Sequence, residues 1–115
     1  MNDIDREEHR LAALAAGYEV KRDSDMDTDF LMDGDRVVAI EGQWSPKTNK
    51  ADSFDLMVDC NIIGGFSKTE QKAMAAHPYT GVECETGGHN TAANDLMLAI
   101  FNCAVAMGRS MEKTK

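Results

Sequence analysis

The sequence has few of the features that mark secreted, membrane-spanning or zinc-binding proteins. It holds three cysteines, Cys60, Cys84 and Cys103, an odd number without the CxxC spacing of zinc and redox motifs. Its first residues are acidic, where a secretory signal needs positive charge followed by an apolar run. The longest apolar stretch, residues 96–107, is too short to cross a bilayer. These absences predict a cytoplasmic protein with free thiols and no membrane span.

Basic side chains are also scarce. The 115 residues carry 20 acidic and 12 basic side chains, which gives a net charge of −8. An excess of this size repels a phosphate backbone and argues against direct nucleic-acid binding, whereas it suits a basic protein partner. A well-solvated surface accounts for the same excess without any partner. The charge therefore narrows the class of partner without establishing that there is one.

Apolar periodicity predicts three helices, over residues 3–16, 49–59 and 91–111. The third is apolar nearly all round between residues 96 and 107, which is typical of a helix covered on more than one side. A sheet together with a neighbouring helix would provide that cover, and so would a second subunit in a homo-oligomer built through this helix. In the second helix, one apolar face is expected to meet the core, formed by Ala51, Phe54, Met57 and Val58.

Short strand-like segments predict an antiparallel sheet of four to six strands. Alternating or β-branched runs occur over residues 18–21, 30–32, 36–40, 61–66 and 80–85. Residues 71–76 (Gln71 to Ala76) have a helical composition, but they lie between two strand candidates, and we interpret them as a hairpin strand. The expected fold class is α+β, a single compact domain over residues 1–115. In this α/β/α sandwich, helices cover both faces of one sheet and the C-terminal helix is long and apolar.

Four alternating aspartates, Asp23, Asp25, Asp27 and Asp29, are candidates for partner binding. On a strand they would place like charges on one face, so a solvated loop is the simpler interpretation. An EF-hand loop starting at Asp23 would need glycine at its sixth position and glutamate at its twelfth. Thr28 and Gly34 stand there instead, and no metal site is predicted.

Two further places in the chain are candidates for binding. Trp44, the only tryptophan, is interpreted as a buried anchor, with an exposed partner-binding residue as the alternative. Cys84, His89 and Asn90 lie around a glycine-rich turn before the last helix, where a weak ligand or metal site is possible. Neither a GxGxxG pattern nor a P-loop is complete there. With no complete catalytic motif in the chain, we predict neither enzymatic activity nor a cofactor.

The order of these segments resembles a family of small bacteriophage proteins described as having a phage ABA-sandwich domain. The likeness rests on residues 16–20 (Ala-Gly-Tyr-Glu-Val), on Trp44-Ser45-Pro46 followed by residues 51–54, and on the ending over residues 94–109. It implies an antiparallel sheet with helices on both faces, in a protein encoded by a phage or prophage. The family offers no catalytic motif to transfer, and the aspartate run is denser in this chain.

Three functional hypotheses follow. The first is a small non-enzymatic accessory protein of a phage or prophage, acting in the bacterial cytoplasm by binding a host or phage protein. The second is an acidic inhibitor that mimics nucleic acid and occupies a host defence or regulatory protein. The third is a small-ligand or metal-binding module at the turn from Cys84 to Asn90.

Overall fold

The computed structural model describes residues 2–88 and 91–113, and it has the α+β composition that the sequence predicts. Within these ranges all strand pairs are antiparallel. Residues 72–76 form a strand, so the interpretation of this ambiguous segment is confirmed. The elements in chain order are α1 (Asp3–Ala16), β1 (Glu19–Asp23), β2 (Thr28–Asp33), β3 (Arg36–Ile40), the 3-10 helix η1 (Glu41–Gln43), α2 (Lys50–Asp59), β4 (Ile63–Ser67), β5 (Lys72–Ala76), β6 (Glu83–Gly87) and α3 (Ala92–Lys113).

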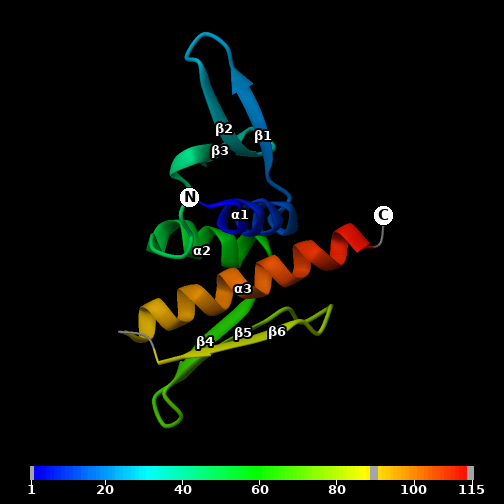
Figure 1. The fold of residues 1–115 in the computed structure, drawn as a ribbon. Helices are drawn as coiled ribbons and strands as arrows, with labels where there is room; N and C mark the ends of the chain where they lie inside the picture. Colours follow the sequence, from blue (N-terminus) through cyan, green and yellow to red (C-terminus); the bar gives the residue numbers. More distant parts are fainter. Residues whose placement is uncertain (1, 89–90, 114–115) are drawn as a thin grey trace.

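The described strands form two three-stranded sheets instead of the single sheet that the sequence led us to expect. One has the order β1-β2-β3 and the other β4-β5-β6, so every pair joins neighbours in the sequence. Figure 1 shows the helices between the two sheets, which reverses the layering of the expected α/β/α sandwich. Pairing between neighbours closes only short loops and costs little entropy. β3 and β4 also follow one another, but the connection between them contains the whole of α2, so pairing these two strands would close a much longer loop.

Local signals set the helix ends. The side chain of Asn2 caps α1 by accepting a hydrogen bond from the backbone N–H of Asp5 at 2.8 Å. Gly17 ends this helix in the left-handed conformation, with φ at +79°, where a residue without Cβ is favoured. Asn49 caps α2 in the same way through the backbone N–H of Asp52 at 3.0 Å. The two asparagine caps therefore fix the residues at which α1 and α2 begin.

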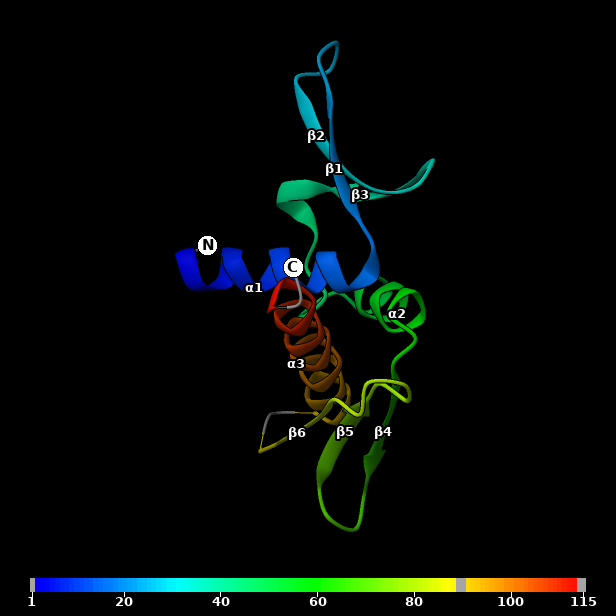
Figure 2. The same cartoon turned by 90° about the vertical axis from the view of Figure 1, so that its right-hand side faces the viewer.

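α3 lies at the centre of the core and is covered on opposite sides by elements of the same chain. Sheet β4-β5-β6 covers one side, with Ala73 and Ala75 of β5 fully buried beneath the helix. α1 crosses the other side, as Figure 2 shows. At the crossing, a Cβ added to Gly108 would lie 2.1 Å from the carbonyl oxygen of Leu11. The long C-terminal helix thus finds its cover within one chain.

The buried face of α2 differs from the expected one. Phe54 and Val58 are 60% and 57% exposed, whereas Ser53, Leu56 and Cys60 are buried. The predicted face was therefore wrong, because Ala51, Phe54 and Val58 are exposed and only Met57 is half-buried. Ser53 and Cys60 are small, so the buried side of α2 can approach the neighbouring elements closely. The apolar pattern of the sequence does not show that these small residues are the buried ones.

The first sheet projects from the helices at one end of an elongated molecule, whose principal extents are 52 × 32 × 26 Å. Only Leu31 of its three strands is buried. Over the described ranges, no helix is long and apolar enough to cross a membrane.

Candidate functional site

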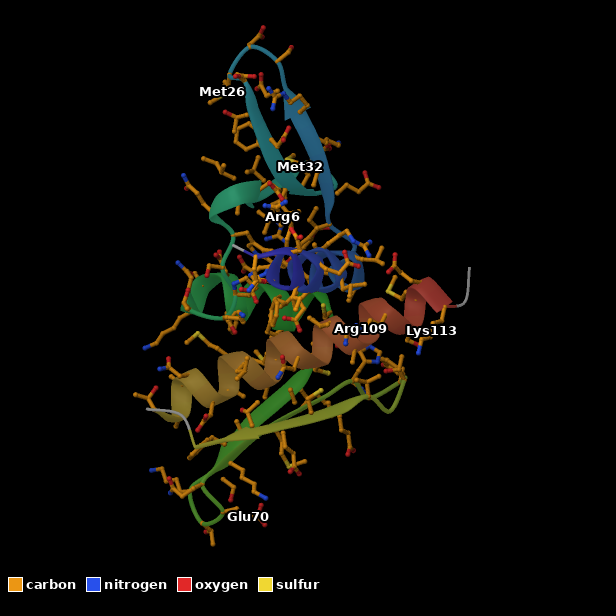
Figure 3. All side chains as sticks on the ribbon, in the orientation of Figure 1. Arg6, Met26, Met32, Glu70, Arg109 and Lys113 are labelled. Carbon is orange, nitrogen blue, oxygen red and sulfur yellow. The ribbon has the colours of Figure 1, made fainter. Side chains whose placement is uncertain are left out.

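We call the projecting sheet β1-β2-β3, residues 19–40, the meander. The strand register places Phe30 beside Ile40 and Met32 beside Val37, on the face turned away from α1. These four side chains give the outer face an apolar area that is partly open to solvent, with Val37 55% and Ile40 39% exposed. A shallow depression of about 550 Å³ lies on it, lined by the apolar residues Met26, Phe30, Met32 and Val37 and by the polar residues Lys21, Arg22, Asp23 and Ser24. Figure 3 shows Met26 near the tip and Met32 near the base. A contiguous exposed apolar face of this kind is typical of an interaction site.

The aspartate run forms the tip of the meander, as the turn between β1 and β2 and its flanking strand ends. Asp23 builds the turn, because its Oδ1 accepts hydrogen bonds from the backbone N–H groups of Asp25 at 3.0 Å and Met26 at 3.2 Å. The guanidinium of Arg22 pairs with Asp27 and, at 3.2 Å, with Asp29. Three of the four aspartates are therefore engaged within the meander itself.

A groove of about 760 Å³ separates the inner face of the meander from α1, and we call it the α1–meander groove. Its floor and walls are apolar, formed mainly by Leu14, Val20, Leu31 and Trp44. Charged side chains from α1 and η1 line its rim. Figure 3 shows one of them, Arg6, extending from α1 toward the meander.

Trp44 is 4% exposed, as the anchor interpretation predicts. Its indole meets the rings of Tyr18 at 5.8 Å and His9 at 6.0 Å edge to face, an arrangement that aromatic rings favour. The imidazole of His9 is oriented by its Nδ1, which donates to the carbonyl oxygen of Asp5 at 2.6 Å. Trp44 therefore reaches a partner only through the part of its ring that lines the groove, and it serves as an optical probe of that groove.

One corner of the meander is tied to the helices by a polar cluster around Asp59, at the end of α2. Asp59 accepts hydrogen bonds from the hydroxyl of Tyr18 and from Arg36 at 2.6 Å. Arg36 also pairs with Asp33 at 2.9 Å. Burial, and then the hydrogen bond to Asp59, raise the pKa of the Tyr18 hydroxyl far above its usual range, so this group stays a donor. The cluster fixes the orientation of the meander relative to α2.

The described part of the turn before α3 gives little support for a ligand or metal site. Cys84 is half-buried, and burial raises its pKa. Burial also raises the pKa of Cys60 to about 12 and that of Cys103 to about 11, so these thiols carry little of the reactive thiolate at neutral pH. His89 and Asn90 lie outside the described residues. In the part of the chain that the structure describes, no three His, Cys, Asp or Glu side chains are placed to hold a metal ion.

No family model, no curated protein and no solved structure matches this chain. The likeness to the bacteriophage proteins thus rests on the sequence motifs alone.

Sequence reasoning identified the aspartates and Trp44 but missed the outer face and the groove. A signal was present, because Phe30 and Leu31 are adjacent apolar residues in one strand and must point to opposite faces. A three-stranded sheet that is apolar on both faces needs cover on both. Local patterns do not show which face the rest of the chain leaves open.

Proposed function

We propose that this chain is a small accessory protein of a phage or prophage that catalyses no reaction. It acts in the bacterial cytoplasm by binding a host or phage protein through the outer face of the meander. The observation that carries the proposal is the exposed apolar area on a sheet that projects from the helices, because such surfaces often mark sites of protein–protein interaction. The phage origin is supported by the family likeness of the sequence.

The charge around this face favours a basic partner. Carboxylates outnumber basic groups in the meander and in the residue after it. The acidic residues are Glu19, Asp23, Asp25, Asp27, Asp29, Asp33, Asp35 and Glu41, and the basic ones are Lys21, Arg22 and Arg36. Lys21 and Arg22 line the depression itself, but the meander as a whole carries an excess of carboxylates, which complements an apolar patch with lysine or arginine at its edge. Long-range attraction then raises the rate of encounter more than the final affinity.

The two other hypotheses have less support. A nucleic-acid mimic needs a row of carboxylates spaced like phosphates, but Asp27 and Asp29 share the guanidinium of Arg22 and Asp23 is oriented by the turn, so the run does not form such a row. A ligand site at the turn before α3 would use Cys84, whose thiol is held protonated by burial. The outer face of the meander offers both exposed area and charge, so a protein partner fits the observations best.

The test compares two valines of equal exposure on different elements. Val37 lies on the outer face, 55% exposed, and Val58 lies on α2, 57% exposed. We expect Val37→Lys to abolish recovery of a stoichiometric partner from a lysate of the bacterial host, because it removes apolar contact and adds repulsion toward a basic surface. Val58→Lys carries the same change of charge and should leave recovery intact. If no recovered protein depends on Val37, the proposal is wrong.

A further inference from the structure

We propose that the α1–meander groove binds a short extended segment of the partner protein in which lysine or arginine alternates with apolar side chains. The inference rests on the proposed function and adds a second contact, on the face of the meander opposite Val37. One partner that clasps the meander would thereby reach both faces of a thin, three-stranded sheet.

The groove offers apolar surface that the fold leaves open. Leu31 at its floor is buried, but Val20 on its wall is 57% exposed although it faces the interior of the groove. Leu14 and Trp44 complete the apolar lining. The volume of about 760 Å³ falls in the range of roughly 300–1,000 Å³ that is typical of ligand sites. An occupant would therefore cover Val20 without any change in the packing of Leu31.

The rim favours a cationic occupant. Asp3, Glu7 and Glu41 line it together with Arg6 and Arg10. Arg10 is engaged, because its guanidinium binds Glu7 at 2.5 Å and Glu112 of α3 at 2.8 Å. The remaining charged residues of the rim are Asp3, Glu41 and Arg6, which leaves an excess of one negative charge around an apolar floor. Lysine or arginine beside apolar side chains complements this combination.

The length of the groove favours an extended peptide over a compact small molecule. It follows α1 from Asp3 to Leu14, about 16 Å at the helical rise of roughly 1.5 Å per residue. About five residues of extended chain, at roughly 3.3 Å each, span the same length. Alternate side chains of such a segment would face the apolar floor, and the others would face the charged rim.

The test uses the full chain and the fluorescence of Trp44, which is the only tryptophan and lines the groove. The probe is a short, capped peptide that alternates lysine and leucine. We expect a saturable change in emission, and an affinity about tenfold lower for Val20→Lys, which corresponds to the loss of one good contact. Val37→Lys and Val58→Lys introduce the same charge outside the groove and should bind the peptide like the wild type.

A second pair of variants keeps the test decisive if Val20→Lys fails to fold. Glu41→Lys reverses an exposed charge on the rim, and Glu70→Lys makes the same change at the far end of the molecule, where Figure 3 shows Glu70 beyond β4 and β5. We expect only Glu41→Lys to weaken binding, by several-fold. Equal weakening by both would show general charge attraction and overturn the inference. So would equal affinity for a peptide that alternates glutamate and leucine, or tighter binding of an isolated alkylamine.

The two proposals fail separately. If a partner from the lysate depends on Val37 while the lysine–leucine peptide leaves Trp44 fluorescence unchanged, the groove inference is wrong and the proposed function stands. If the peptide binds in a Val20-dependent way but no partner depends on Val37, the proposed function is wrong and the groove is a binding site in its own right.

Discussion

At Gly108 the backbones of α1 and α3 come into direct contact. Replacing a helical glycine by alanine ordinarily stabilises a helix by about 1 kcal/mol. Here the new methyl group would lie 2.1 Å from the carbonyl oxygen of Leu11, and backbone atoms cannot rotate aside. We therefore expect Gly108→Ala to lower the free energy of unfolding by about 1–3 kcal/mol or more, measured by urea denaturation.

The matched control for this prediction is Gly65 on β4, whose added Cβ would meet no atom within 4 Å. Gly65→Ala should change the free energy of unfolding by no more than about 0.5 kcal/mol. Stabilisation by Gly108→Ala would mean that α1 does not cross α3 at this residue.

The cluster of Tyr18, Arg36 and Asp59 orients the meander more than it stabilises the fold. The carboxylate of Asp59 is 18% exposed and the guanidinium of Arg36 is 46% exposed. An ion pair that open to water contributes little net free energy. Its three side chains come from the end of α2, from the start of β3, and from the link between α1 and β1, so they fix a direction between elements. The groove and the outer face depend on that direction.

Among the elements, α3 contributes most to the core, and Phe101 is its largest fully buried side chain. Its ring contacts His9 of α1 at 4.8 Å and lies 5.4 Å from the Nζ of Lys47. We expect Phe101→Ala to lower the free energy of unfolding by about 3–5 kcal/mol, because it leaves a cavity between α1 and α3. Phe54→Ala, at an exposed position on α2, should cost about 0.5 kcal/mol in the same denaturation experiment. Similar losses for both phenylalanines would contradict the central place of α3.

The elements themselves could be predicted from local sequence. Asn2 and Gly17 mark the ends of α1, and the segment around Asp33 and Gly34 marks a hairpin. Periodicity locates the other helices and strands, although the last strand lies at Glu83–Gly87 instead of the predicted residues 80–85. The division of the strands into two sheets could not be predicted, because it depends on which strand edges meet. The buried face of α2 was missed for a related reason. Small residues such as Ser53 become core positions only where another helix approaches closely.

The candidate site shows the same limit. The sequence indicated the charged tip of the meander as a candidate site, because four aspartates at alternate positions form a recognisable pattern. The structure shows that Arg22 and the turn engage most of them, and that the open surface consists of ordinary strand residues such as Val37. A valine on a strand is normally part of a core. Only the absence of covering atoms in the fold turns it into a candidate for binding.

At the scale of the whole molecule, the covering of α3 bears on self-association. A homo-oligomer built through this helix would first have to displace α1 or the sheet β4-β5-β6, both of which pack against it. The charge of −8 adds repulsion between copies. We therefore expect the chain to elute as a monomer of 12.6 kDa in size-exclusion chromatography with light scattering at micromolar concentration.

Self-association, if it occurs, is expected first at the exposed apolar face of the meander. The measurement should therefore include Val37→Lys and Val58→Lys. A wild-type mass of twice the expected value that returns to the monomer only in Val37→Lys would place a second copy on the face proposed for the partner. Self-association and partner binding would then compete, and the partner would have to displace that copy. A dimer that persists in both variants would instead indicate association through α3. Phe101→Ala should then weaken the dimer and also lower the free energy of unfolding.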